Sequence, residues 1–386
     1  MSVLKKKLAI LGAGDFQNPL ILKAKEKGCE THVFAWQCGD IGEKTADHFY
    51  PVSTAEKDKI LDMCREIGID GICTIGSDFN NITATYVANK LGLTANTMEA
   101  VERSTNKHLM RQTFELHGDS SPKSMLVTPE SRDSVDISEM RFPLIVKPTD
   151  RSGSRGITRL ERPEELQPAL DAAFSCSWEH AAVVEEYVTG EEFSVEHISW
   201  EGEHHFLQMT KKFTTGAPHF IETGHFEPAL ISPELLARTQ TVVTHALDSL
   251  GVKYGASHAE VIIDRDGQPW IVEIGSRMGG DCIGSDLVEL STGIDFVGGV
   301  VDVALGVKPD LSPRHPAGFS MIRFVFSQED LDALGRAQKE NPELLCKVSK
   351  IEPFDHAVTD SSNRFGFFIM RGQSFSQLYP YVPALQ

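Results

Sequence analysis

The chain has 386 residues, a length that predicts several packed domains rather than one small core. Its 37 lysines and arginines stand against 55 aspartates and glutamates, a formal net charge of −18 that repels phosphate backbones and anionic lipid. We therefore expect neither nucleic acid nor a membrane as a partner, since no apolar run reaches spanning length, and the seven scattered cysteines without CxxC spacing favour a reducing cytoplasm.

The first hundred residues alternate between strand and helix patterns, as in "KLAILGAGDFQNPLILKAKEKGCETHVFAW". Such alternation predicts a parallel sheet covered by helices. In "GAGDFQ", Gln17 stands where the third glycine of a dinucleotide fingerprint belongs, so a tight strand-to-helix turn is favoured over NAD binding. We expect this turn and the "GSD" of residues 76–78 to face a cleft at the carboxyl ends of the strands.

The rest of the chain mixes strands with single helices. "STNKHLMRQTFELHG" predicts a helix with its N-cap within residues 104–106 and its end at Gly118. Strand patterns from Phe142 onward surround the helix "PEELQPALDAAFS". Residues 214–232 are too rich in glycine, proline and polar groups for a regular element, which predicts a functional loop. The tail from Ala317, with "FSMIRFVF" and "GFFIMRG", predicts a small capping domain.

Two glutamates are predicted to face each other across a hairpin. "EVIIDRDGQPWIVE" contains Asp266-Gly267, a dipeptide typical of two-residue turns. A turn centred there pairs Arg265 with Gln268 and Glu260 with Glu273, and puts both glutamates on one face of the sheet. Two carboxylates about 5 Å apart repel by about 3 kcal/mol at an effective dielectric near 20. A bound divalent cation, typically Mg²⁺ with phosphates, is the simplest way to offset that repulsion.

Three further segments have features of a phosphate site. Beyond Glu273, Arg277 precedes the pair Gly279 and Gly280, where a guanidinium and close backbone amides could hold a carboxylate or phosphoryl oxygen. In "KPTDRSGSRGI", Lys147 ends an apolar strand and a loop of glycine and serine follows, which predicts a flap between two strands rather than a P-loop. In "VVEEYVTGEEF", a strand with acidic residues breaks at Gly190, and its backbone could bind an adenine edge.

Together and in this order, over residues 1 to about 310, these segments resemble the ATP-grasp superfamily in its biotin carboxylase and carbamoyl phosphate synthetase branch, and most of all the L-amino-acid ligases. The resemblance implies an α/β and α+β fold in four parts: a pre-ATP-grasp α/β domain (1–100), an N-terminal lobe with the flap (101–187), a C-terminal lobe with the metal site (188–316) and a β-rich capping domain (317–386).

The resemblance also implies roles for individual residues. ATP contacts are expected from Lys107, Lys147, Ser152, Gly153, Ser154, Gly156, Glu185, Glu186, Val188, Glu192 and Lys212. Magnesium ligands are expected at Glu260 and Glu273, and catalytic side chains at Arg277 and Lys212. Substrate contacts are expected from Glu222, His225, His258, Arg277, Gly279 and Gly280.

One position departs from the family pattern, which reads Glu, one residue, Asn, one residue, Arg. Here Gly275 replaces the asparagine, a further metal ligand, so the count of magnesium ions stays open between one and two, with Mn²⁺ as an alternative metal. In the predicted hairpin register Gly275 faces His258, which leaves room for that imidazole or for substrate.

The function implied is an ATP-dependent carboxylate-amine ligase that passes through an acyl phosphate and releases ADP and phosphate. Its partners would be a small carboxylate and an amine, and a homodimer stays open. One alternative is a purine- or urea-pathway relative acting on formate, bicarbonate or a nucleotide intermediate. Another is a non-catalytic ATP-binding regulator, for which Gly275 is the sequence hint.

Overall fold

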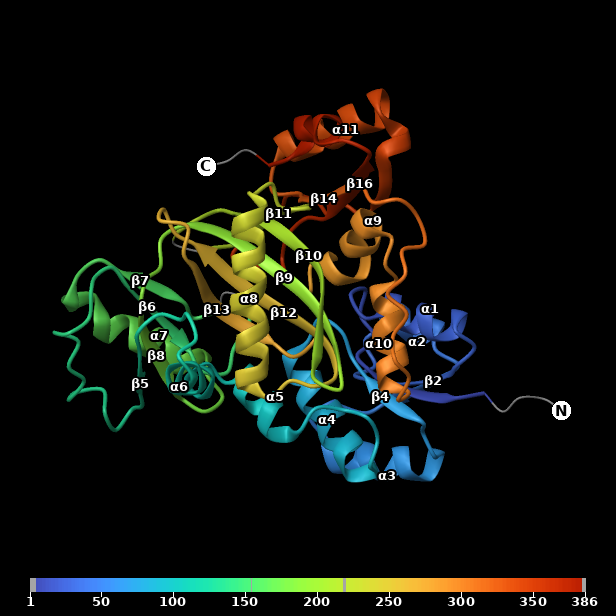
Figure 1. Ribbon diagram of the computed structural model, residues 1–386, viewed down its shortest axis with the longest axis horizontal. Coiled ribbons are helices and arrows are strands. Elements are labelled where there is room, and N and C mark those ends of the chain that lie inside the picture. The colour runs from blue at the N-terminus through green and yellow to red at the C-terminus, as the bar shows by residue number, and fades with distance from the viewer. Residues whose placement is uncertain (1–4, 154, 218–219, 384–386) are drawn as a thin grey trace.

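The N-terminal part of the chain, blue in Figure 1, is a four-stranded parallel sheet. The computed structural model describes residues 5–153, 155–217 and 220–383. The strands lie in the order β3 (His48–Pro51), β2 (Glu30–Ala35), β1 (Lys7–Leu11) and β4 (Gly71–Cys73), and every pairing is parallel. The helices are α1 (Asn18–Glu26), α2 (Ile41–Thr45), α3 (Lys57–Ile67), α4 (Asp78–Leu91) and α5 (Met98–Thr105). The predicted alternation and parallel sheet are confirmed.

A second four-stranded sheet forms a separate lobe, green at the left of Figure 1. Its antiparallel strands lie in the order β5 (Ser124–Val127), β8 (Ala182–Glu186), β6 (Leu144–Pro148) and β7 (Thr158–Leu160). Helices α6 (Lys107–His117) and α7 (Leu166–Cys176) accompany it. The Asn106 side chain caps α6 by accepting from the backbone N–H groups of His108 and Leu109, and Gly118 ends it with φ +75°, as predicted. The glycine- and serine-containing loop joins β6 to β7, so its place between two strands is also confirmed.

The largest sheet has eight strands and runs through the middle and top of Figure 1. Its order is β13 (Pro269–Gly275), β12 (Gly255–Ile263), β9 (Glu191–Trp200), β10 (Glu203–Thr214), β11 (Glu222–Glu227), β14 (Phe319–Phe324), β16 (Phe367–Gly372) and β15 (Leu345–Val348). Its helical elements are α8 (Pro233–Leu250), η2 (Ile283–Leu287), α9 (Val288–Thr292), α10 (Phe296–Ala304), α11 (Gln328–Glu340) and α12 (Phe375–Leu378). The strands predicted in the tail therefore extend this sheet through the β11–β14 pairing.

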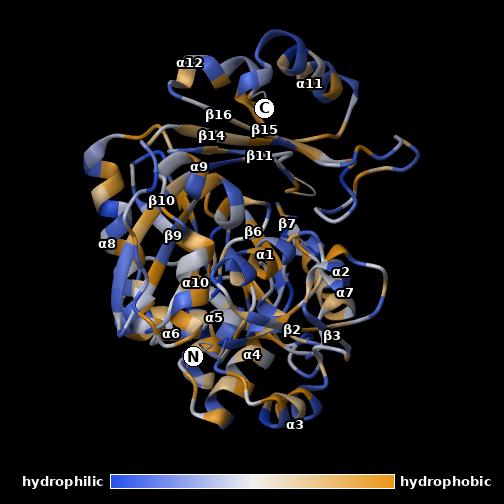
Figure 2. Ribbon diagram, turned by 90° about the vertical axis from the view of Figure 1, so that its right-hand side faces the viewer, coloured by the Kyte–Doolittle hydropathy of each residue, from blue (hydrophilic) through white to orange (hydrophobic). Residues whose placement is uncertain are grey.

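Two helices bury apolar surface against the large sheet. The buried face of α8, with Val243, Leu247 and Leu250, packs on strand residues of β9, β10, β12 and β13. Helix α10 is apolar on nearly all sides and packs between this sheet and the N-terminal one, where Phe296 and Val301 join a shared core. Figure 2 shows α11 and α12 beside β14–β16 at one end of the molecule and α3 at the other. No described helix is long and apolar enough to span a bilayer.

The β12–β13 hairpin reaches the predicted pairing by an unpredicted route. Glu260 does face Glu273, and His258 faces Gly275. The tip, however, is longer than the predicted two-residue turn, because the Asp264 backbone N–H donates to the carbonyl of Gln268 and Ile263 pairs with Pro269. An irregularity between Glu260 and the next residue shifts the register back by one. The predicted Arg265–Gln268 pair is wrong, and the predicted glutamate pair is right.

The prediction that residues 214–232 hold no regular element is wrong in part. Strand β11 occupies residues 222–227 and is hydrogen-bonded on both sides, to β10 and to β14. Its sequence, "ETGHFE", lacks the apolar alternation that predicts a strand. His225 and Glu227 are polar but are buried instead of facing solvent.

Candidate active site

A buried charge cluster links the small lobe to helix α6. Glu185, at the end region of β8, is 1% exposed and accepts from Arg111 Nε at 2.7 Å and from Lys147 Nζ at 3.1 Å. Burial by itself disfavours the ionised carboxyl, but the two cations outweigh burial and lower the pKa of Glu185 to about 2. Arg111 also donates to the backbone carbonyl of Val272 at 2.6 Å, which ties this cluster to β13 of the large sheet.

Most of the predicted nucleotide residues line one narrow cavity between the small lobe and the large sheet. Its volume is about 110 Å³. Among its lining residues are Lys147, Glu185, Glu186, Val188, Glu192, Lys212, Glu222 and Glu260. They come from β6, β8, the β8–β9 connection, β9, β10, β11 and β12, so the fold gathers segments more than a hundred positions apart. Burial raises the pKa of Glu192, and the neighbouring Lys212 only partly opposes this.

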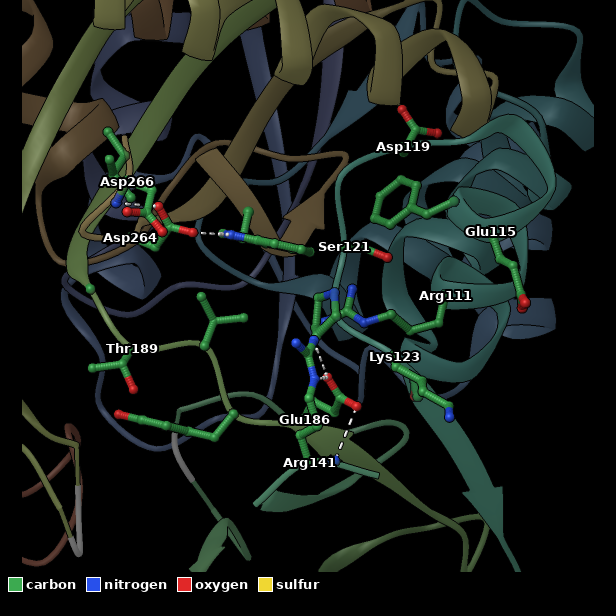
Figure 3. Close-up of a pocket in the computed structure, with 18 of the residues that line it drawn as sticks. Arg111, Glu115, Asp119, Ser121, Lys123, Arg141, Glu186, Thr189, Asp264 and Asp266 are labelled. Atoms are coloured by element: carbon green, nitrogen blue, oxygen red, sulfur yellow. Dashed lines mark hydrogen bonds and ion pairs between the residues drawn. The ribbon is translucent and has the colours of Figure 1, made fainter. Parts of the chain in front are cut away.

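A larger cavity of about 1330 Å³ lies beside it, bounded by α6, the β8–β9 connection and the β12–β13 turn (Figure 3). The two cavities share Pro122, Glu186, Tyr187 and Val188 in their walls. In the larger one Glu186 accepts from the exposed Arg141 at 2.7 Å, and Asp264 and Asp266 lie across from them. The smaller cavity remains the candidate site, because it is where the buried lysines and carboxylates converge.

The facing glutamates each have a lysine partner. Lys212 Nζ lies 2.6 Å from Glu260 Oε1, and Lys107 Nζ lies 3.0 Å from Glu273 Oε2. Both lysines are buried, 7% and 4% exposed. Burial disfavours the Lys212 cation, but Glu260 and the other carboxylates outweigh burial and raise the Lys212 pKa. Directly opposite carboxylates on one sheet face are oxygen ligands of the kind that Mg²⁺ takes, so the donor set fits such an ion.

Arg277 is held by a partner that the sequence patterns did not identify. Its Nε and Nη2 both donate to the Asp78 carboxylate at 2.8 Å, from the loop after β13 to the first turn of α4. Burial disfavours the Arg277 cation, but Asp78 outweighs burial and raises the pKa of the guanidinium. A Cβ at Gly275 would lie 3.0 Å from Asp78 Oδ1 and 3.2 Å from Arg277 Cζ. Glycine at this position leaves room for the ion pair.

His258 forms a second buried pair next to the glutamates. Its Nδ1 lies 2.5 Å from Oε1 of the fully buried Glu196, and its Nε2 lies 3.8 Å from Glu260 Oε1. Burial disfavours the imidazolium, but Glu196 outweighs burial and raises the pKa of His258 to about 9. A Cβ at Gly279 would come within 2.6 Å of His258 Nδ1, so this glycine allows the loop to pass closely over the pair.

Side chains of the C-terminal segment contact the region around Glu222 and His225, two of the expected substrate-binding residues. Arg364 donates to both oxygens of Asp281, at 2.9 and 2.5 Å, and its guanidinium lies 3.5 Å from the centre of the Phe324 ring. His225, 1% exposed, has its Nε2 3.5 Å from Asp281 Oδ2. Ser361 Oγ donates to Glu222 Oε2 at 2.6 Å.

The predicted flap begins beside one of these pairs, because Lys107 Nζ donates to the backbone carbonyl of Arg151 at 2.8 Å. Ser152 and Gly153 are exposed, Gly156 packs where a Cβ would meet Cys176 and Pro148 at 3.0 Å, and Ser154 lies outside the described residues. At Gly280 an added Cβ would meet nothing within 4 Å. The structure thus gathers the lysines, the glutamates, the histidines and Arg277, whereas Ser152 and Gly153 of the flap are exposed.

Four charged residues of the site were not predicted, namely Arg111, Glu196, Asp281 and Arg364. Asp78, the last residue of "GSD", was expected at the cleft, but its pairing with Arg277 was not. Arg111 carried a usable signal, because it lies four positions after Lys107 on the same face of a predicted helix. The other three become neighbours of the site only through strand pairing.

A small antiparallel lobe and a larger antiparallel sheet that enclose lysines and facing glutamates, after a parallel α/β unit, define the ATP-grasp class of fold. Residues 140–285 match the family model of the ATP-grasp domain. The chain therefore contains an ATP-grasp domain, which confirms the resemblance seen in its sequence.

Named proteins similar to this chain include ligases. It is 24% identical over 245 residues to an alanine–anticapsin ligase of Bacillus subtilis (strain 168), covering 58% of this chain and 51% of that protein. It is 25% identical over 196 residues to a D-alanine–D-alanine ligase of Hydrogenovibrio crunogenus, covering 49% and 58%. The chain thus spans only about half the length of these relatives. An L-amino acid ligase structure from Bacillus licheniformis matches its fold with a TM-score of 0.80 at 23% identity, covering 98% of this chain and 96% of that one.

Proposed function

We propose that the protein is an ADP-forming ligase that joins a small carboxylate to an amine at the expense of ATP. The observation that carries the proposal is the convergence of Lys107, Lys147 and Lys212 with the facing pair Glu260 and Glu273 between two lobes of an ATP-grasp fold. The named relatives that are ligases of alanine support the same class of reaction.

The chemistry explains why such a site needs many cations. A carboxylate is a poor electrophile, because its charge repels nucleophiles and oxide is a poor leaving group. Transfer of the terminal phosphoryl group of ATP to a carboxylate oxygen gives an acyl phosphate, and attack by the amine then expels phosphate. Such a transfer is catalysed mainly by positioning and by neutralising the charge on the phosphoryl oxygens.

The residues of the chain divide this work. The predicted roles of Lys147 and Lys212 are to bind phosphoryl oxygens, and both side chains are buried and line the same cavity. Asp78 fixes the orientation of the Arg277 guanidinium, proposed to hold the acyl phosphate. Glu260 and Glu273 would hold Mg²⁺, which when bound supplies further neutralisation of phosphate charge. The backbone of 185–188 is proposed to bind adenine and Glu192 the ribose hydroxyls.

The decisive experiment measures phosphate release from MgATP over a matrix of amino acids, small acids and amines. Once a productive pair is found, Glu260→Gln and Arg277→Ala should each abolish release while the far-ultraviolet circular dichroism stays unchanged. Arg65→Ala, on exposed surface of α3, is the matched control and should turn over normally. Near-wild-type release by either site variant would overturn the assignment.

Two other functions predict different results in the same matrix. A relative acting on formate, bicarbonate or a nucleotide intermediate would release phosphate only with those compounds. A non-catalytic regulator would bind ATP tightly and release none with any set. A cytoplasmic location, Mn²⁺ as a substitute metal, a count of one or two Mg²⁺ ions and a homodimer also remain proposals.

A further inference from the structure

Three potential metal ligands meet at the edge of the N-terminal sheet, outside the ATP-grasp site. We propose that Glu30, His32 and His48 bind a divalent transition-metal ion of the zinc type, with solvent completing the coordination. Among the described residues these three offer ligand atoms that all lie within 4.8 Å of one another.

The strand geometry brings the three side chains to one face. Glu30 and His32 are two positions apart on β2, so they point the same way. His48 is the register partner of His32 on β3, the edge strand, which within the described part of the chain pairs with β2 alone. Two imidazoles and one carboxylate are thereby fixed by backbone pairing rather than by loops, which favours a precise ligand set.

The distances are close to those of a coordination shell. Nε2 of His48 lies 3.0 Å and Nε2 of His32 lies 3.2 Å from the same oxygen, Oε1 of Glu30. Two ligands about 2.0–2.1 Å from a tetrahedral ion are about 3.3 Å apart. The rings of His32 and His48 stack with their centroids 4.7 Å apart. The His48 side chain is half-exposed, so it can rotate to bring its ligand nitrogen closer to that of His32.

His32 is prepared to act as a neutral ligand. Its side chain is 4% exposed, and its buried Nε2 has the Glu30 carboxylate oxygen 3.2 Å away. An imidazole nitrogen and a carboxylate oxygen at this separation are both ligand atoms that one metal ion can take. On the other side of the ring, Nδ1 lies 3.0 Å from the Tyr50 hydroxyl. A hydrogen bond there fixes the ring and, when Nδ1 donates, leaves the Nε2 lone pair free for a metal.

The neighbouring charge does not block the site. Lys7 is the register partner of Glu30 on β1, but its ammonium donates to the carbonyl of Ile67 at 2.9 Å. Glu30 and His48 keep about a third and a half of their side-chain surface exposed, which gives an ion a route in. Selection of a transition metal over Mg²⁺ follows from the two imidazoles, since Mg²⁺ prefers oxygen ligands.

The position separates this ion from the proposed ligase chemistry. Glu30 and His48 begin their parallel strands, whereas Asp78, which pairs with Arg277 of the ATP-grasp site, follows the carboxyl end of β4. A metal here would join the edge strand β3 to β2 and stabilise the N-terminal unit without touching a substrate. Metal binding by Glu30, His32 and His48 therefore does not depend on the proposed ligase function.

Cobalt titration tests the site directly. Co²⁺ added to metal-stripped full-length protein in excess Mg²⁺ should give one saturating equivalent with the intense visible bands of tetrahedral coordination, displaced by Zn²⁺. Excess Mg²⁺ occupies the glutamate site, and octahedral oxygen coordination absorbs far more weakly. His48→Ala and Glu30→Gln should each weaken Co²⁺ binding at least tenfold, and Tyr50→Phe about tenfold. Zn²⁺ should raise the Tm of the wild type and not that of His48→Ala.

His356→Ala is the matched control, because His356 is also exposed and paired with a carboxylate, Asp355 at 2.7 Å, but lies in the C-terminal part. It should bind Co²⁺ like the wild type. The proposal is overturned if no saturable tetrahedral spectrum appears, if His48→Ala keeps it, or if the spectrum carries the thiolate charge-transfer absorption of a cysteine site. The stacked rings of β2 and β3 would then be packing alone.

Discussion

The Asp78 carboxylate holds the Arg277 guanidinium through two hydrogen bonds of 2.8 Å, although the residues are 199 positions apart. The pair joins the N-terminal α/β unit to the end of the glutamate hairpin. It also occupies the space beside Gly275, where the family pattern has asparagine. The departure at this position is thus matched by a charge pair that fixes the proposed catalytic arginine.

Gly275→Asn should impair the protein rather than restore a missing metal ligand. Its Cβ would lie 3.0 Å from Asp78 Oδ1 and 3.2 Å from Arg277 Cζ, so one partner must move. Displacement of a positioning group by about 1 Å costs about 100-fold in rate, and we expect a fall in kcat of that order with little change in the KM for ATP. Steady-state phosphate release measures it. Gly335→Asn, where an added Cβ meets nothing within 4 Å, is the control. A gain in Mg²⁺ affinity or rate would contradict the expectation.

The glutamate pair could be predicted because a hairpin carries register from a recognisable turn. Asp266-Gly267 marked the turn, and alternation put Glu260 opposite Glu273. The prediction missed both the longer tip and the irregularity beyond Glu260. Each shifts the register by one residue, in opposite directions, so the predicted pairing of Glu260 with Glu273 is still correct. Bulges depend on the fit of neighbouring strands, and nothing in the local sequence signals this one.

The partners of the site could not be predicted from local patterns. Arg364 reaches Asp281 from a segment 83 positions away, and only the β11–β14 pairing brings that segment over the site. Glu196 is an acidic residue in a strand, which a pattern places at the surface, yet His258 makes its burial tolerable. Buried ion pairs of this kind are properties of the assembled sheet, whereas lysines that end strands or begin helices carry their own signal.

Acid should destabilise the protein in part through Glu185. Its carboxyl has a pKa of about 2 in the folded state and about 4.5 when unfolded, so it contributes about 3 kcal/mol above pH 4.5, lost progressively as the pH falls towards 2. Urea unfolding across this range should show a weaker pH dependence in Glu185→Gln. At neutral pH that variant should lose about 3–5 kcal/mol, because Arg111 and Lys147 stay buried without their partner. Glu66→Gln, on exposed surface, is the control and should change neither value.

Glu227 should have the opposite effect. Burial raises its pKa to about 8, and hydrogen bonds of 2.8 Å from the Thr210 and Ser291 hydroxyls only partly oppose this. The folded state therefore keeps a proton that the unfolded state releases, and stability falls as the pH rises from about 4.5 to about 8. Between about pH 5 and about pH 8, the fall in the free energy of unfolding should be about 3 kcal/mol smaller in Glu227→Gln than in the wild type. Urea unfolding at the two pH values measures it, and an unchanged difference between them would exclude a protonated Glu227.

Arg364→Ala should separate co-substrate binding from nucleotide binding. Arg364 pairs with Asp281 beside His225 but does not line the cavity proposed for ATP. Removing it leaves the partly buried Asp281 carboxylate without its bidentate partner, so we expect turnover with the acid and amine to fall about 100-fold. The Kd for ATP, measured by calorimetry, should stay within about twofold of the wild type. Arg336→Ala, an exposed position on α11, should change neither quantity. A parallel loss of ATP affinity would place Arg364 in the nucleotide site, and normal turnover would leave the C-terminal segment without a part in the reaction.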